Sequence, residues 1–495
     1  MPKIYESELI KQTLDEVAPN YPQLCEYESE WIYFANHYYQ AGQPVNLEYQ
    51  SLKDVKSGTI QNTIPFNFTK AMLKGETLIN IQPHSDFFVD SQTVAWLNIP
   101  TTINPVAGVR YFIKFYNKPT NLTACYLGDV KMSIGNANYV IIYAESSQNI
   151  LHVYGNGFTN DLFVNCKVLI CEYQDGMENW KIPYFEGMQS VKTPVLKTTG
   201  KNLFDGKLEL GGLDTATGKP NDGQTDRCRS TNYVKVKPNT SYIFSLNYGS
   251  VIGVREFDEE YGYSKIWCSL SGDMRTFITS KNTHFIKFIV INTHSDNLVQ
   301  LEEGSVATEY EPYKSNILTV NEDVELRGIG DVKDELNLLT GELVQKTEKF
   351  IFDGSETWGI VSSLEKNNTI FAQCFKYSKE NTKAISNVLN YDTGLDIHDE
   401  RGFRFNIAFQ IRLNKNEISN ITNDGVKEWV SKNNIIVMRV KEQTVKTVDL
   451  SAEKIKPYEG GMTFQTSSET IPPNLEIKCP VVSTGTQTLY EINND

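Results

Sequence analysis

Three carboxylates follow one another at Asp258, Glu259 and Glu260. Paired carboxylates on either side of a sugar are the groups that hydrolyse glycosidic bonds. The same stretch also has the pattern of a β-hairpin, because alternating residues lead into an acidic turn with Gly262 and aromatic residues follow it. We favour the hairpin interpretation, and we predict no catalytic residue in this chain.

Two other residue groups invite a chemical interpretation. His-Ser-Asp occurs at residues 84–86 and 294–296, but three adjacent residues cannot form one triad, since triad side chains converge from separate positions. Asn221, Asp222 and Asp226 carry oxygen ligands of the kind that calcium prefers, but their spacing fits no named calcium loop. A solvated turn is the favoured interpretation, and the sequence predicts no metal site and no cofactor.

Aromatic residues in the later strands have the composition of a sugar-binding surface. A β-sandwich that binds sugar needs an exposed ring for the apolar face of the sugar, and amide or carboxylate groups for its hydroxyls. For any one of these residues, packing in a core is the favoured interpretation, because aromatic residues in strands are usually buried. The candidate glycan-binding residues are Trp96, Tyr126, Tyr154 and Asn156, and further along the chain Tyr248, Tyr261, Tyr263 and Trp267.

The segment from residue 21 to residue 49 is unusually rich in aromatic residues, and such a surface must be buried against something. It either packs on the first β domain or forms a docking surface for another subunit or a larger particle. The candidate docking residues are Tyr27, Trp31, Tyr33, Phe34, Tyr38 and Tyr39.

The elements that carry these residues are predicted to be mostly β-strands. The main periodic pattern is alternation with period two, which is typical of half-buried strands. Helix is predicted only at 5–17 and at 425–432, the latter with Thr422 among its possible caps. We therefore expect tandem antiparallel β-sandwich domains of the jelly-roll kind. The clearest alternation is at 402–413, and shorter examples lie at 109–116, 163–171, 241–248 and 284–291.

A Pro-Tyr motif suggests where the domains end. Proline fixes φ where a chain leaves a sheet, and the adjacent tyrosine can cover the end of a core, so we interpret the motif as a domain-closing element. It occurs at 183–184, 312–313 and 457–458. The predicted division is an N-terminal attachment segment at 1–60 and β domains at 61–190, 191–316 and 317–495, the last with one short helix.

Composition limits the classes of partner. In 495 residues, 47 Lys and Arg stand against 61 Asp and Glu, for a formal net charge of −14. This charge argues against nucleic acid and anionic membranes as partners. No apolar run approaches the roughly 18 residues of a spanning helix, and the first thirty residues have no signal-peptide pattern, so we expect no membrane insertion. The eight cysteines are scattered, and we interpret them as reduced and mostly buried.

Several longer motifs resemble those of minor structural proteins of bacteriophages that infect low-GC Gram-positive bacteria. The motifs are LKGETLIN at 73–80, KNLFD at 201–205, QLEEGSVATEYEPY at 300–313 and LRGIGDVKDELNLLTGE at 326–342. The resemblance implies a tail, baseplate or fibre protein of the receptor-binding kind. It also implies galactose-binding-like, carbohydrate-binding jelly rolls and a homotrimer.

These observations predict a bacteriophage virion structural protein that contributes to adhesion to host-surface glycan. The alternative is a purely architectural subunit, such as a head fibre, a collar or a baseplate connector. A third interpretation is a depolymerase of capsule or wall polysaccharide. The expected partners are other virion proteins, further copies of the chain and host cell-wall glycan. The expected location is the virion, after synthesis in the host cytoplasm.

Overall fold

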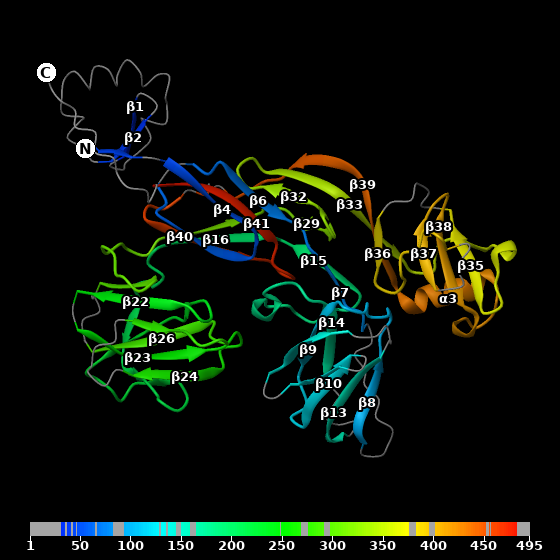
Figure 1. Cartoon of the computed structure of the whole chain (residues 1–495), viewed down its shortest axis with the longest axis horizontal. Helices are drawn as coiled ribbons and strands as arrows, with labels where there is room; N and C mark the ends of the chain where they lie inside the picture. Colours follow the sequence, from blue (N-terminus) through cyan, green and yellow to red (C-terminus); the bar gives the residue numbers. More distant parts are fainter. Residues whose placement is uncertain are drawn as a thin grey trace.

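The fold is mainly antiparallel β, as predicted, and α3 is the single α-helix among the residues that the structure describes. Figure 1 shows the computed structural model. The predicted helix at 5–17 lies outside the described residues. The structure describes residues 31–34, 37–40, 43–45, 47–64, 67–82, 94–127, 130–134, 137–144, 150–158, 165–247, 249–268, 276–291, 298–375, 383–395, 401–451, 455 and 457–482.

Two facing sheets at the centre are built from strands far apart in the sequence. The seven-stranded sheet has the order β36-β39-β33-β32-β6-β41-β4, with bounds Ala384–Ser386, Ile435–Thr447, Glu342–Phe352, Glu335–Asn337, Lys70–Lys74, Asn474–Val482 and Leu47–Val55. The four-stranded sheet has the order β28-β16-β40-β5, with bounds Ser315–Thr319, Val195–Gly200, Gly461–Ser467 and Ser57–Gln61. Adjoining them are β29-β15-β7 (Glu325–Leu326, Met188–Lys192, Thr77–Ile79) and β30-β31 (Gly328–Ile329, Val332–Lys333).

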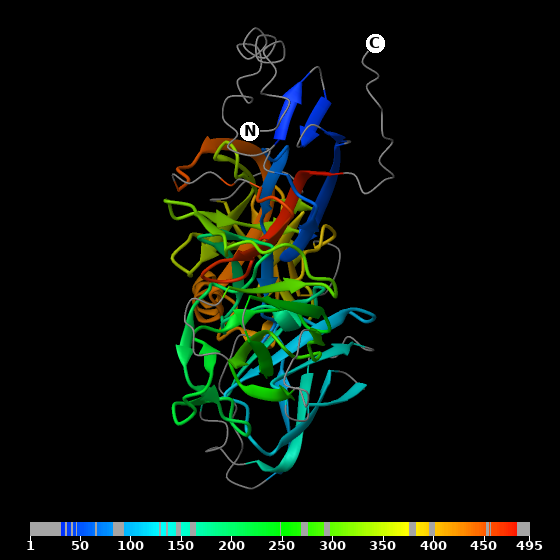
Figure 2. The ribbon, with the colours of Figure 1, turned by 90° about the vertical axis from the view of Figure 1, so that its left-hand side faces the viewer.

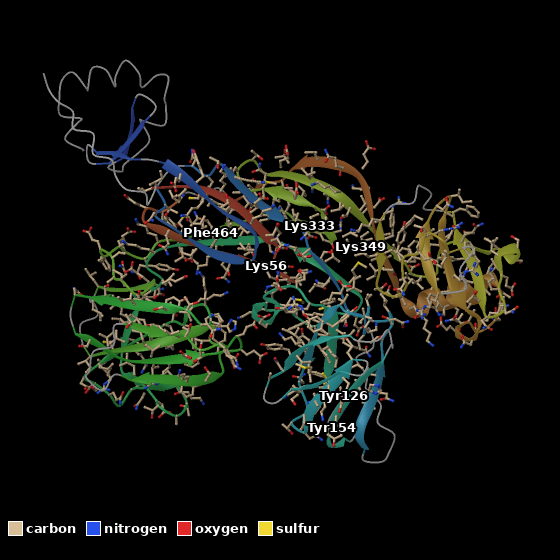
Figure 3. The ribbon with its side chains drawn as sticks, in the orientation of Figure 1. Lys56, Tyr126, Tyr154, Lys333, Lys349 and Phe464 are labelled. Carbon is tan, nitrogen blue, oxygen red and sulfur yellow. The ribbon has the colours of Figure 1, made fainter. Side chains whose placement is uncertain are left out.

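We call this central unit the scaffold. Its core lies between the two sheets: Leu73 and Leu475 of one layer and Leu196 and Phe464 of the other belong to one buried cluster. Phe464 is labelled in Figure 3. Along β41, buried residues at odd positions from Leu475 alternate with more exposed ones, which is the period of a strand with one buried face.

The first inserted domain follows β7 and is a sandwich of two sheets around its own core. One sheet has the order β11-β10-β13-β8, with bounds Val130–Ser133, Leu122–Leu127, Ile150–Phe158 and Val94–Pro100. The other has the order β12-β9-β14, with bounds Tyr139–Tyr143, Arg110–Tyr116 and Lys167–Glu172, and the short 3-10 helix η4 (Met177–Asn179) follows it.

The second inserted domain lies between β16 and β28 and is also a sandwich around its own core. Its larger sheet has the order β17-β20-β26-β23-β24, with β21 also on β26, and bounds Leu208–Leu210, Cys228–Ser230, Phe285–Ile291, Ser250–Phe257, Tyr263–Cys268 and Val234–Lys235. The smaller sheet is β25-β22-β27 (Thr276–Ile278, Ser241–Leu246, Val299–Glu303), and a hairpin pairs β18 (Gly212–Leu213) with β19 (Pro220–Asn221).

The third inserted domain lies between the long strands β33 and β39. Its sheet has the order β34-β35-β38-β37, with bounds Trp358–Ile360, Thr369–Cys374, Phe409–Asn414 and Gly402–Phe405, and 3-10 helices η5 (Ser362–Leu364) and η6 (Lys415–Glu417) flank it. The predicted helix near 425–432 is confirmed as α3 (Asn423–Asn433), and the Thr422 hydroxyl accepts a hydrogen bond from the Gly425 amide as its N-cap. Helix residues Val426, Trp429 and Val430 are buried in the domain core.

The predicted single strand at 402–413 is wrong. The chain turns at Asn406 and Ile407, so β37 and β38 form a hairpin whose two faces are both buried. The polar residues that suggested a solvent-facing side are buried: Arg404 Nε donates to Gln410 Oε1 (2.7 Å), and Arg412 Nε donates to a backbone carbonyl. The alternating pattern shows which side chains are polar. It does not show that these polar side chains have hydrogen-bond partners inside the domain and can therefore be buried.

The observed domain arrangement differs from the sequential division. The boundaries predicted near 60, 190 and 316 each fall inside a scaffold strand, namely β5, β15 and β28. Strands β4 and β5 of the supposed attachment segment pair with β41 and β40 at the other end of the chain. The Pro-Tyr motifs at 183–184, 312–313 and 457–458 each precede a scaffold strand. They therefore mark points at which the chain enters a scaffold strand.

The N-terminal strands and the first inserted domain lie on opposite sides of the scaffold. Strands β1 (Trp31–Phe34), β2 (His37–Gln40) and β3 (Gln43–Val45) form a small antiparallel meander. Figure 2 shows β1 and β2 at the top and the first inserted domain at the bottom, and Figure 1 shows the same separation. The scaffold lies between these two parts.

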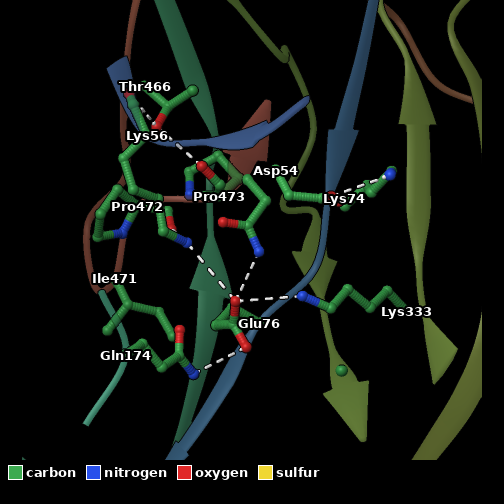
Figure 4. A network of polar contacts seen from close by, with 12 residues as sticks. Asp54, Lys56, Lys74, Glu76, Gln174, Lys333, Thr466, Ile471, Pro472 and Pro473 are labelled. Atoms are coloured by element: carbon green, nitrogen blue, oxygen red, sulfur yellow. Dashed lines mark hydrogen bonds and ion pairs between the residues drawn. The ribbon is translucent and has the colours of Figure 1, made fainter. Parts of the chain in front are cut away.

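A buried carboxylate, Glu76, joins four segments of the scaffold and its surroundings (Figure 4). Glu76 Oε2 accepts from Asn474 Nδ2 (2.6 Å) and lies 3.6 Å from Lys56 Nζ and 3.4 Å from Lys333 Nζ. Glu76 Oε1 accepts from Gln174 Nε2 (3.0 Å). Burial lowers the pKa of Lys56 to about 8, against the opposing effect of the Glu76 charge. One carboxylate therefore compensates two lysines.

Replacing Glu76 by Gln will destabilise the scaffold. The substitution leaves the largely buried ammonium of Lys56 without its anion, and breaking a buried ion pair on one side is costly. We expect a loss of about 2–4 kcal/mol in the free energy of unfolding, measured by urea denaturation. The control is Glu322→Gln, which removes an exposed pair with Lys446 and should cost under about 0.5 kcal/mol. Equal losses in both variants would contradict this role for Glu76.

The lowered pKa of Lys56 predicts a pH dependence of stability. Between the folded pKa of about 8 and an unfolded value of about 10.4, the unfolded chain holds a proton that the folded chain has released, so stability rises with pH. Below pH 8 both states are protonated and the contribution is constant. The stability of the wild type relative to Lys56→Met should therefore increase by up to about 3 kcal/mol from pH 8 to pH 10.5. A difference independent of pH would refute it.

Candidate functional site

The outer face of sheet β11-β10-β13-β8 brings together two of the predicted glycan-binding residues. Cys125 and Val153 point into the core, so their neighbours Tyr126 and Tyr154 face the other way. Tyr126 is opposite His152 and Tyr154 is opposite Ala124. The two tyrosines are therefore diagonal neighbours on adjacent strands.

Lys131 joins the two rings. It lies opposite Tyr126 on the edge strand β11, and its Nζ is 5.6 Å from the centre of the Tyr126 ring and 5.3 Å from that of the Tyr154 ring. These distances suit cation–π attraction, which holds the rings on one surface. The Tyr154 side chain is 39% exposed. Both tyrosines lie at the end of the first inserted domain that faces away from the scaffold (Figure 3).

Polar groups stand beside the rings. His152 Nδ1 and Asn98 Oδ1 are hydrogen-bonded across β13 and β8. Trp96 is opposite Tyr154 in register, and Asn156 follows two residues later in β13; the side chains of Trp96 and Asn156 lie outside the described part of the structure. We call the side chains of Tyr126, Lys131, His152, Tyr154 and Asn98 the tyrosine face. It combines apolar rings with imidazole, amide and ammonium groups, which is the composition that sugar recognition requires.

Sequence reasoning missed Lys131, His152 and Asn98. Each becomes part of the face only through strand register, because each lies opposite a partner on the neighbouring strand. The alternation of His152 with the apolar residues Leu151 and Val153, which are buried, is the local signal that could have placed His152 on an outer face. The pairing of β8 with β13 joins residues more than fifty positions apart, and no local pattern reports it.

Two candidates of the second inserted domain, Tyr261 and Tyr263, have described side chains, and Tyr261 is 45% exposed. Tyr261 stacks on Phe285 with ring centres 4.5 Å apart and lies 4.7 Å from the Tyr233 ring. Tyr263 donates a hydrogen bond from its hydroxyl to the Thr215 carbonyl (2.7 Å). Tyr248 lies outside the described residues, as does the side chain of Trp267. Glycan binding by this group therefore stays a prediction.

The three carboxylates at 258–260 form the turn of a hairpin between β23 and β24, as the favoured interpretation has it. Asp258 Oδ1 accepts from the amides of Glu260 (3.0 Å) and Gly262 (2.7 Å). Glu260 Oε1 accepts from Asn138 Nδ2 of the first inserted domain (3.0 Å). Burial raises the pKa of Glu259, and the positive charge of Lys114 opposes this. Asp258 and Glu260 thus hold a turn and a contact between domains.

The residues once considered for calcium pair with other groups. Asp222 Oδ1 lies 2.7 Å from Arg229 Nη2, and Asp226 forms two contacts with Arg227, at 2.7 and 2.8 Å. Asn221 Oδ1 accepts from the Gly223 amide. Within the described residues, no three His, Cys, Asp or Glu side chains are placed to share a metal ion.

The six described cysteines, Cys125, Cys166, Cys171, Cys228, Cys374 and Cys479, are free and buried, as the sequence predicts. Burial raises the pKa of Cys125 to about 12, so its thiol stays protonated at neutral pH. Among the helices of the described residues, none has the length and apolar character needed to cross a membrane.

The predicted docking residues fall in or near the N-terminal meander. Trp31, Tyr33 and Phe34 lie in β1, and Tyr38 and Tyr39 lie in β2. Tyr27 lies outside the described residues, as do the side chains of the other five. Docking through this segment therefore stays a prediction.

Comparison with known proteins gives no match: no family model, no curated protein and no solved structure is significantly similar to the chain. The geometry of the site and the sequence motifs are thus the grounds for assigning a function.

The turn at 258–262 provides a direct test of the role of its carboxylates. Asp258→Ala removes the acceptor of two amide hydrogen bonds and should destabilise the second inserted domain by about 1–2 kcal/mol. Asp258→Asn keeps the acceptor oxygen and should stay within about 0.5 kcal/mol of the wild type. Thermal unfolding followed by calorimetry measures both. The depolymerase interpretation would be favoured instead if the wild type released reducing sugar from host wall polymer and both Asp258 variants lost this activity equally.

Proposed function

We propose that this protein is a structural protein of a bacteriophage particle that binds host-surface glycan through the tyrosine face. The observation that carries the proposal is the placement of Tyr126, Lys131 and Tyr154 on one outer face, with Tyr154 39% exposed. An exposed ring costs free energy in water, which a sugar recovers by covering it. The neighbouring amide and imidazole supply hydrogen bonds to sugar hydroxyls.

The architecture supports a role in a particle. Tyr126 and Tyr154 lie on the opposite side of the scaffold from the N-terminal strands (Figure 3), and the sequence of these strands is rich in aromatic residues. A protein that attaches at one end and binds at the other needs this separation. The motif resemblance to phage tail, baseplate and fibre proteins favours the same role.

Several copies on one particle would make weak sites sufficient. A shallow face with two rings binds a single sugar weakly, but linked copies raise the effective concentration of each further site. The proposal therefore includes a homotrimer in the virion, which mass photometry of the purified full chain measures directly. A monomer at micromolar concentration would remove the trimer from the proposal.

Binding of host wall polysaccharide by the full chain tests the proposal. Tyr126→Ala and Tyr154→Ala should each weaken binding at least about tenfold. Each removes a ring whose burial beneath a bound sugar contributes roughly 1.5–3 kcal/mol to the free energy of binding. The control is Tyr143→Ala, which removes a ring that is 56% exposed on the other sheet of the same domain. Surface plasmon resonance on immobilised wall polymer measures all three.

Two outcomes would contradict the proposal. If the wild type binds no wall polymer from Gram-positive hosts, the protein is an architectural subunit without a glycan of its own. If Tyr143→Ala weakens binding as much as Tyr154→Ala, the sugar is bound elsewhere on the domain.

A further inference from the structure

Three basic side chains lie buried in a row on the outer face of the larger sheet of the second inserted domain. They are Arg229 on β20, Lys287 on β26 and Arg255 on β23, and they are 5%, 6% and 2% exposed. Their neighbours along the strands, such as Val254 and Phe288, point into the core on the opposite face. We call these three residues the cation row.

The charges of the cation row are only partly compensated. Arg255 and Lys287 are directly opposite each other in register, and like charges in that position repel. Arg229 is the one member with carboxylate partners, Glu209 (2.6 Å) and Asp222 (2.7 Å). Among the described residues, no carboxylate lies within ion-pair distance of Arg255 or Lys287.

The Arg255 guanidinium has an unused donor. Its Nε donates to the Asp214 carbonyl (3.2 Å) and its Nη2 to the Leu213 carbonyl (3.0 Å), whereas Nη1 is buried without a hydrogen-bond partner. The nearby Asp214 carboxylate accepts from the amides of Ala216 and Thr217 in its own turn. A buried charged donor without an acceptor costs several kcal/mol, so the site is built for an acceptor that the chain itself does not supply.

Lys287 is the second member of the row without a carboxylate partner among the described residues. Its Nζ lies 5.3 Å from the centre of the Tyr233 ring. Burial lowers the pKa of Lys287; Glu209 opposes this shift and the positive charge of Arg229 adds to it. An anion beside Lys287 and Arg255 would relieve the repulsion between them. Tyr233 is 42% exposed and marks the side on which the row comes nearest to solvent.

A short hairpin segment covers the row. Arg229 Nη1 donates to the Gly212 carbonyl (3.1 Å), so the backbone at 211–214 lies directly on two of the guanidinium groups. Gly211 has φ +123°, and a Cβ there would come 2.4 Å from Arg229 Nη1, so the close approach requires glycine. The segment includes β18, which pairs with β19 over two residues per strand, and Gly212 and Leu213 are both buried over the row.

We propose that the cation row is a binding site for the oxyanion of an acidic saccharide, a uronate carboxylate or a sugar phosphate. Nη1 of Arg255, the guanidinium nitrogen that the chain leaves without an acceptor, offers a charge-assisted hydrogen bond to either group, and Lys287 supplies the second charge. The site lies in a different domain from the tyrosine face and does not depend on glycan binding there. It also differs in ligand, because the tyrosine face suits the apolar side of a sugar ring.

Isothermal titration calorimetry of the full chain tests the site with three probes, sodium glucuronate, glycerol 3-phosphate and inorganic phosphate. Glucose is the neutral control, and all buffers are matched in ionic strength with sodium chloride. We expect saturable binding of at least one oxyanion and none of glucose. Glucuronate alone identifies a carboxylate site, and the two phosphates alone identify a phosphate site.

Variants separate binding from a structural role. Arg255→Met and Lys287→Met should each weaken oxyanion binding at least about tenfold, since each removes a charged partner. Lys287→Met should keep or raise the melting temperature without ligand, because an unpaired buried charge is gone. Arg255→Met should lower it, because the Leu213 and Asp214 carbonyls lose their donor. The control is Arg227→Gln, which removes an Arg of the same domain that is paired with Asp226 and should leave oxyanion binding unchanged.

The proposal is wrong if the wild type binds none of the three oxyanions, or if Lys287→Met binds them as tightly as the wild type. A fall in melting temperature in both variants without any oxyanion binding by the wild type would show that the row only clamps the 211–214 backbone. Tyr154→Ala should leave oxyanion binding intact, so this result is independent of the tyrosine face.

Discussion

The scaffold depends on the pairing of strands from the two ends of the described chain. Glu76 lies where the late strand β41 pairs with the early strand β6. Its carboxylate binds Asn474, which lies 398 residues further along the sequence. Lys56, beside Glu76, donates to the Pro472 carbonyl, 416 residues away. Neither sheet of the scaffold is complete without the last two strands. The buried charges of Lys56 and Glu76 thus favour the native strand register, because a strand paired in a shifted register would leave these charges buried and unpaired.

Closure of this kind allows whole domains to be inserted between scaffold strands. Each insertion leaves and returns at neighbouring points of the scaffold, so its size hardly affects the strands that flank it. Specific contacts then fix the insertions. Lys237 of the second inserted domain pairs with Glu303 and donates to the Thr59 hydroxyl of β5. Asn138 of the first domain donates to Glu260 of the second. The many long-range pairings predict slow folding.

Local features were predictable from the sequence, and long-range ones were not. Strand positions such as 284–291 and the helix capped by Thr422 follow from period and capping, which involve only near neighbours. The Pro-Tyr motifs are visible in the sequence, but the strand that follows each motif belongs to the scaffold and not to a new domain. The predicted boundaries therefore fall within β5, β15 and β28. Of the tyrosine face, composition indicated Tyr126 and Tyr154. Lys131 and His152 needed the register of β10, β11 and β13, which no local pattern carries.

The two candidate binding faces show how one kind of sheet supports different chemistry. In both, the inner face packs a sandwich core and the outer face carries the side chains proposed to bind. The tyrosine face is open, so its lysine stays hydrated and its rings offer apolar surface. The cation row lies beneath the 211–214 backbone, where lower polarisability strengthens every charge interaction. Because the chain carries a net charge of −14, the long-range field repels anions. An anion would therefore bind here only through short-range contacts in a covered site, and the fold supplies that cover at the cation row.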